Sequence, residues 1–177
     1  MIRTMAGIAC LAFVSLPALA QHHGYAGMKD REIKALSAEQ VQQYQAGAGM
    51  GYALPAELNR FPGPMHVLEL SDKLGLAPEQ RAKTQALMDA HKAEARVLGA
   101  KRVESERALE ILFRSGKVEE AALAKSVRDA AALEGEYRLA HLETHRRMRA
   151  LLSDQQVDAY VRLRGYDRTG QRHKGHH

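Results

Sequence analysis

Two long stretches of this chain, residues 78–113 and 117–152, have the pattern of long helices. After the proline that opens the first, neither stretch contains another proline, and each contains a single glycine. Each can therefore form one unbroken helix of about 50 Å, at 1.5 Å per residue. Helices this long in a small chain are typical of a coiled-coil-like hairpin. The pattern predicts an all-α fold: a long antiparallel helical hairpin with short flanking helices and a turn at residues 114–117.

The second long stretch also carries a heptad seam, in which the side chains on one helical face follow alternating steps of four and three. The seam is apolar at both ends and more polar in its middle. Its members are Leu123, Val127, Ala130, Glu134, Tyr137, His141, Thr144, Met148 and Leu151.

A short phrase beginning with leucine and ending with glutamine four residues later occurs three times, at residues 36–40, 76–80 and 152–156. In the first and third copies a serine follows the leucine, and the glutamine lies three residues after that serine. This is the pattern of a capping box, in which the two side chains satisfy backbone N–H groups at a helix start. The second copy has Pro78 at the first helical position, where a missing N–H costs little. The phrase predicts helix starts at about residues 38, 78 and 154.

The first 20 residues have the pattern of a secretory signal peptide. Arg3 supplies a positive charge, residues 8–16 an apolar stretch, and Ala18-Leu19-Ala20 a cleavage site. We expect cleavage after Ala20 and export to the periplasm. The apolar stretch is too short to span a membrane and no later segment approaches that length, so we expect no membrane insertion after cleavage.

The rest of the chain divides by composition. We predict that residues 21–63 form a loosely structured segment with one short helix. Within this segment, the glycine-rich residues 47–51 form a flexible connection. A Pro-Gly-Pro sequence then starts a short helix that we expect to end near residue 73. We predict that residues 64–166 form the helical domain and that residues 167–177 form a disordered tail rich in basic residues and histidine.

Composition narrows the function. Cys10, the only cysteine, leaves with the signal peptide, which excludes disulfides, thiolate metal sites and cysteine nucleophiles from the mature chain. The full chain carries a formal charge of +5, and loss of Arg3 leaves +4. No basic run with interleaved aromatic residues suggests a nucleic-acid surface. No catalytic motif stands out, so we predict that the protein is not an enzyme. Its few aromatic residues favour a thin core that a second subunit completes.

A cluster of histidines and methionines is the candidate chemistry. His141, His145 and Met148 share one face of the second long helix. Antiparallel pairing about the turn places facing residues at numbers that add to about 231, so Met88 and His91 face the two histidines. His66 is the remaining candidate ligand, and Glu69 lies one turn after it. Helical bundles build metal sites from such inward groups, and these donors suit Zn, Cu, Ni or Co. The alternative is that these residues belong to the core or to a solvated helix face.

Both ends of the mature chain offer a second metal possibility. Cleavage after Ala20 exposes Gln21-His22-His23, where a free amine and a third-position histidine can bind Cu(II) or Ni(II). The tail histidines add weak capture; they are His173, His176 and His177. The alternative is that both ends are polar disordered termini.

The repeated phrase before long helices, in an exported basic chain, resembles the Leu-Thr-x-x-Gln motif of the Spy/CpxP family of periplasmic helical proteins. Residues 65–166 carry the resemblance, with Ser or Ala in place of the family's Thr. The superfamily includes the zinc-resistance-associated ZraP proteins and the CnrX-like heavy-metal sensors. The resemblance implies a bent hairpin whose two copies form a dimeric cradle.

CnrX-like sensors carry His-x-x-x-Met on the last long helix, shortly before the final Leu-x-x-x-Gln turn. Met148 lies in that setting here, but Thr144 stands at the place of the histidine, and His141 and His145 are shifted alternatives. The amino-terminal histidine pair of those sensors is represented at most by His66.

We therefore expect a homodimeric periplasmic metal-binding protein of envelope metal-stress defence or sensing. One alternative is an ATP-independent chaperone that holds unfolded clients in the cradle. Its basic rim would come from Lys92, Arg96, Lys101 and Arg102. Another alternative is a periplasmic regulator of a membrane sensor kinase.

Overall fold

The computed structural model describes residues 25–167, which are helical and contain no strand. The predicted signal peptide, the Gln21-His22-His23 terminus and most of the predicted tail lie outside these residues. The short 3-10 helix η1 (Ala26–Met28) belongs to an N-terminal unit, residues 1–30, and six α-helices belong to the second unit, which begins at Arg31. The predicted all-α class is confirmed. None of the described helices is both long and apolar enough to cross a membrane.

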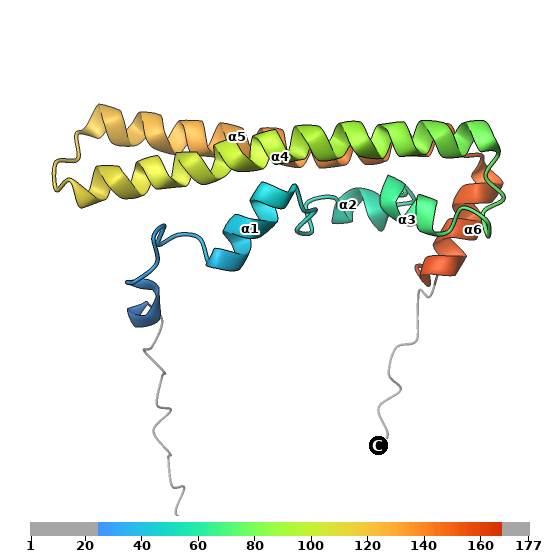
Figure 1. The fold of residues 1–177 in the computed structure, drawn as a ribbon, viewed down its shortest axis with the longest axis horizontal. Coiled ribbons are helices and arrows are strands. Elements are labelled where there is room, and N and C mark those ends of the chain that lie inside the picture. The colour runs from blue at the N-terminus through green and yellow to red at the C-terminus, as the bar shows by residue number, and fades with distance from the viewer. Residues whose placement is uncertain (1–24, 168–177) are drawn as a thin grey trace, which may run out of the picture. The chain divides into compact units, whose positions relative to one another are not determined.

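The predicted hairpin consists of α4 (Pro78–Arg114) and α5 (Glu120–Leu151), which run side by side in opposite directions (Figure 1). α5 begins three residues later than expected. In the turn, Gly116 has a φ of +67° and the Ser115 hydroxyl accepts a hydrogen bond from the Lys117 N–H. The backbone therefore leaves the helical conformation across residues 115–119. The last helix, α6 (Asp154–Arg164), follows directly.

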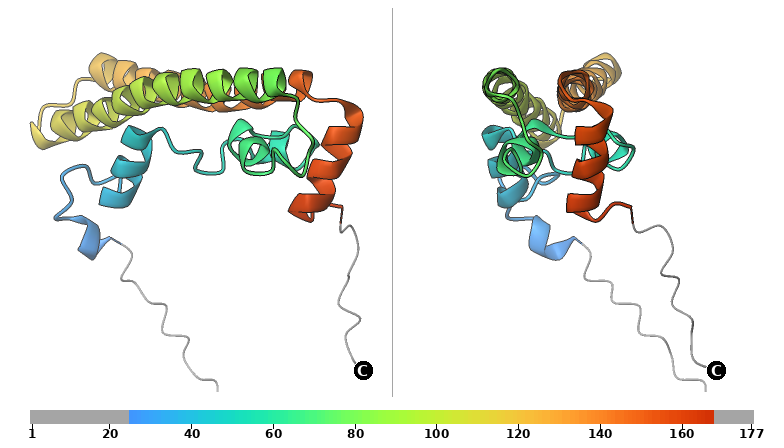
Figure 2. Two further views of the ribbon diagram at one scale, coloured as in Figure 1. Left: turned by 45° about the vertical axis from the view of Figure 1, so that its right-hand side comes forward. Right: turned by 90° about the vertical axis from the view of Figure 1, so that its right-hand side faces the viewer.

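The segment before the hairpin contains α1 (Ala38–Ala46), α2 (Leu54–Glu57) and α3 (Pro64–Glu69). These helices lie along one side of the hairpin, the same side as α6 (Figure 2). Contacts join α1 to α4, α2 to α5, and α3 to both. Two thin helices alone cannot enclose their apolar faces, and this segment supplies the missing layer.

The sequence therefore underestimated the order of residues 31–63. It predicted one short helix before residue 63 and a domain beginning at residue 64, whereas α1 and α2 are both present and belong to the same unit as the hairpin. Ile33, Leu36 and Tyr44 are buried together with Tyr137 of α5. The glycine-rich connection has defined turns, since Gly47 caps α1 in the left-handed conformation and the Tyr52 N–H donates to the Gly49 carbonyl.

The three predicted helix starts are confirmed. Capping boxes at Ser37 and Ser153 begin α1 and α6, and α4 begins at Pro78 after Ala77. The second and third copies also make a contact that their capping role does not explain. The side-chain amides of Gln80 and Gln156 hydrogen-bond to each other in both directions, at 2.9 and 3.0 Å. Gln80 donates in addition to the Leu151 carbonyl at the end of α5. We call this pair the glutamine clasp.

Two groups of buried side chains form the core. One lies at the open end of the hairpin and contains Val67, Leu74, Leu76, Leu87, Met148, Leu152, Val157 and Tyr160. The other lies under α1 and contains Ile33, Leu36, Tyr44, Ala95, Val103 and Tyr137. The predicted seam is buried from Ala130 to Met148 with the exception of Glu134, which reaches Arg102. Val127, nearer the turn, is half exposed.

The contact between α1 and α4 depends on a glycine. A Cβ atom added to Gly99 would lie 1.9 Å from the Tyr44 carbonyl oxygen. Gly99→Ala is therefore expected to lower the free energy of unfolding by about 1–3 kcal/mol. The matched control is Gly135→Ala, because a Cβ there meets no atom within 4 Å and the helix propensity of alanine favours it by up to about 1 kcal/mol. Chemical denaturation followed by circular dichroism measures both, and equal effects would contradict the close approach.

Candidate functional site

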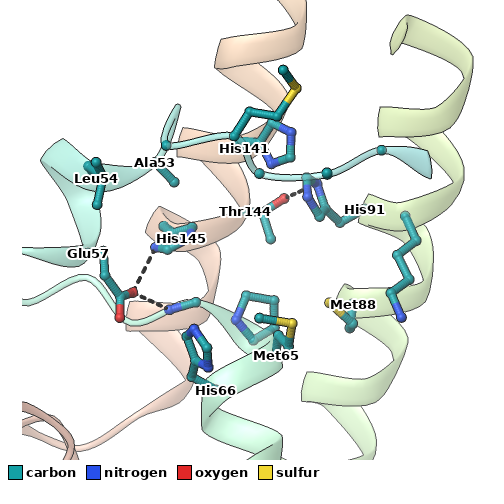
Figure 3. Close-up of a pocket in the computed structure, with 18 of the residues that line it drawn as sticks. Ala53, Leu54, Glu57, Met65, His66, Met88, His91, His141, Thr144 and His145 are labelled. Atoms are coloured by element: carbon teal, nitrogen blue, oxygen red, sulfur yellow. Dashed lines mark hydrogen bonds and ion pairs between the residues drawn. The ribbon is translucent and has the colours of Figure 1, made fainter. Parts of the chain in front are cut away.

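A pocket of about 390 Å³ lies between the hairpin and the segment that precedes it (Figure 3). On α5 its residues fall between Tyr137 of one core group and Met148 of the other. The opposite walls come from α3, from α4 and from the connection between α1 and α2. Its potential metal donors are four histidines and three methionines, namely His66, His91, His141, His145, Met50, Met65 and Met88.

The structure brings together five of the six residues proposed from the sequence. His66, Met88, His91, His141 and His145 all line this pocket. The ring centroids of His91 and His141 lie 4.5 Å apart, at an interplanar angle of 72°. The facing relation expected from antiparallel pairing is therefore present.

The sixth candidate residue has a different role. Met148 is fully buried in the core group at the open end of the hairpin and does not line the pocket. Its position on the seam gave no means of telling a ligand from a core residue, because both point toward the partner helix. Two methionines that line the pocket were not among the candidate ligands predicted from the sequence. Met50 lies between Gly49 and Gly51 in a stretch interpreted as a flexible connection, and Met65 immediately precedes His66.

The hydrogen bonds of His91 determine which of its ring nitrogens carries the proton. The Thr144 hydroxyl donates to the Ala140 carbonyl at 2.8 Å, which uses its only proton. Its contact of 3.1 Å with His91 Nδ1 must therefore be accepted by the hydroxyl and donated by the ring. In the neutral ring, Nε2 of His91 keeps its lone pair.

Two further histidines have the same tautomer. His145 Nδ1 donates to the Phe61 carbonyl at 2.7 Å, and His66 Nδ1 donates to the Glu69 carboxylate at 2.8 Å. Metal-binding histidines in proteins are usually held in this way, with one nitrogen bound to a carbonyl or carboxylate and the other on the metal. In the neutral form, Nε2 of each ring therefore keeps the lone pair that can bind a metal ion.

His141 is the most enclosed of the four. Its side chain lies against the rings of His91 and Tyr137, and its Nε2 is buried without a hydrogen-bond partner. Burial, followed by the effects of the neighbouring His91 and His145, lowers the pKa of His141 to about 4. Burial, followed by the effect of His145, also lowers the pKa of His91. Both rings are neutral at pH 7, and a neutral imidazole is the form that binds metal.

The carboxylate that lines the pocket, Glu57, accepts three hydrogen bonds from the protein. Its Oε1 accepts from the Tyr160 and Tyr166 hydroxyls at 2.5 and 3.0 Å. Its Oε2 accepts from the Gly63 N–H at 3.1 Å and lies 3.6 Å from His145 Nδ1. Glu57 therefore joins α2 to α6 and lies close to His145.

Close packing also determines where the His145 ring can lie. A Cβ atom on Gly63 would come within 2.9 Å of His145 Cε1 and Nε2. The Pro-Gly-Pro sequence, interpreted only as a helix boundary, thus leaves room for this imidazole. Its neighbour Phe61 supplies the carbonyl that orients the ring.

Carboxylates and histidines alone do not complete a metal site here. Within residues 25–167, no three His, Cys, Asp or Glu side chains are arranged to hold a metal ion by themselves. An ion in this pocket would take imidazole nitrogen together with methionine sulfur. Comparison of the chain with protein-family models, curated proteins and solved structures found no match.

Proposed function

We propose that the protein binds a transition-metal ion in this pocket and serves metal-stress defence or sensing in the periplasm. The observation that supports the proposal is the shared tautomer of His66, His91 and His145, each of which keeps Nε2 free while Nδ1 donates to the protein. The predicted signal peptide supports the location.

The position of the pocket gives metal binding a structural consequence. His91 lies on α4 and His145 on α5, whereas His66 lies on α3. With α1 and α2, α3 belongs to the segment before the hairpin that covers one side of it, which we call the covering layer. An ion shared between these groups would hold the covering layer against the hairpin. A change in metal level would then change how firmly that layer is held, which suits both a sensor and a carrier.

We expect Zn(II), Cu(I), Ni(II) or Co(II) to raise the thermal stability of the purified metal-free protein. A ligand that binds only the folded state stabilises it by about 2.7 kcal/mol at a free concentration of 100 times Kd. The joint substitutions His91→Gln and His145→Gln should abolish this gain, measured against the variant's own metal-free melting temperature.

The control protein carries serine at the five terminal histidines, His22, His23, His173, His176 and His177. It should respond to metal like the parent. If the control loses the response and the pocket variant keeps it, the ion binds at the termini and the proposed site is wrong. If no metal stabilises the parent, the proposed function is wrong.

A further inference from the structure

The three methionines of the pocket come from three separate parts of the chain. Met50 lies in the connection between α1 and α2, Met65 in α3 and Met88 in α4. Resting on the proposed function, we propose that the ion of this pocket is Cu(I), held by imidazole Nε2 atoms and methionine sulfur. Thioether sulfur is a soft ligand, and Cu(I) is the soft ion among the candidates.

The charge of the pocket favours a monovalent ion. Thioethers and neutral imidazoles bring no negative charge, and the single charge of Glu57 is offset in part by the Arg164 guanidinium, whose Nε lies 3.9 Å from Glu57 Oε1. The pocket is also lined by Lys92, which adds positive charge. The cost of transferring an ion from water rises with the square of its charge, so an uncompensated divalent ion is penalised most.

The same donor set disfavours the other metals. Protein zinc sites use thiolate, imidazole and carboxylate, and the only cysteine of this chain is Cys10 in the predicted signal peptide. Imidazole binds nickel and copper alike, so histidines alone would not distinguish them. The methionine sulfur atoms favour copper, as Cu(I), over nickel because thioether sulfur is a soft ligand.

Methyl NMR of the metal-free protein labelled at its methionine methyl groups tests this directly. Cu(I) is diamagnetic, so the signals stay observable during an anaerobic titration. We expect the methyl signals of Met65 and Met88 to shift on addition of one equivalent of Cu(I). Met148 is the internal control, because it is buried in the core and does not line the pocket. Unshifted Met65 and Met88 signals in a protein that has bound Cu(I) would overturn the proposal.

Competition with bicinchoninate, a Cu(I) chelator, measures the affinity. The joint substitutions Met65→Leu and Met88→Leu keep the bulk but remove the sulfur, and should weaken Cu(I) binding at least tenfold. Met148→Leu should leave Cu(I) binding unchanged. An unaltered affinity in the double variant would overturn the Cu(I) proposal.

These outcomes separate the Cu(I) proposal from the proposed function. If Zn(II), Ni(II) or Co(II) stabilises the parent through His91 and His145 while the methionine variants bind as the parent does, metal binding stands and Cu(I) is wrong. If neither Cu(I) nor a divalent ion binds in the pocket, both proposals are wrong.

Discussion

Replacement of Met148 with alanine is expected to lower the free energy of unfolding by about 2–5 kcal/mol. Met148 is fully buried among Val67, Leu87, Val157 and their neighbours. Truncation there removes the transfer free energy of the side chain and leaves a cavity that three packed elements cannot easily close. Chemical denaturation followed by circular dichroism gives the change directly.

Two controls separate a core role from a ligand role for this methionine. Met148→Leu conserves volume and should cost less than about 1.5 kcal/mol. Met65→Ala should also cost little, because Met65 is 47% exposed. If Met148→Leu abolished stabilisation by metal while the fold stayed intact, Met148 would be a ligand after all, as the sequence first suggested.

Acidification from pH 6.5 to about 4.5 is expected to destabilise the metal-free protein, toward a limit of about 3 kcal/mol from His141 once its folded pKa is passed. The pKa of His141 is about 4 in the folded protein, against an ordinary value of 6.5. Between these values the unfolded chain binds the proton and the folded protein does not. The stability contributed by neutral His141 is therefore complete above pH 6.5 and is lost as the pH falls. His91 acts in the same direction.

The slope of stability against pH is the measurement that identifies the histidine. The variant His141→Leu has no titratable group at this position and should show a much smaller slope over the same range. Paired carboxylates such as Glu143 and Asp158 have pKa values lowered by arginine, so they titrate below this window. An unchanged slope in the variant would assign the acid sensitivity to another group.

The hairpin and its caps could be predicted because they depend on local chemistry. Capping boxes, proline at a first helical position and heptad spacing act within a few residues. The pairing of His91 with His141 followed from the position of the turn alone. These features need no knowledge of what lies across the hairpin.

The covering layer could not be predicted in the same way. Residues 47–63 combine glycines, prolines and scattered apolar residues, a composition that also describes a flexible linker. Their order comes from long-range contacts, such as Tyr44 against Gly99 and Glu57 with Tyr160. Met50 was missed because it lies in this stretch.

The residues of the candidate site were predicted only in part for the same reason. A helical pattern shows which face a side chain occupies, but not whether that face meets a cavity or a packed core at a given turn. His141 and Met148 lie two turns apart on one seam, and one lines the pocket while the other fills the core. The difference is made by Val67, Val157 and Tyr160, which come from other elements.

The glutamine clasp has a consequence for the spacing of the histidines. Helix ends normally fray. At the open end of this hairpin, however, Gln80 hydrogen-bonds to Gln156, which lies 76 positions later in the chain. Gln80 ties the start of α4 to the last carbonyl of α5, about three turns from His91 on α4 and about two turns from His145 on α5. Donor atoms held at a fixed separation before an ion arrives lose less entropy when it binds. A residue pair that does not line the pocket thus limits how far α4 and α5 can separate at this end of the hairpin.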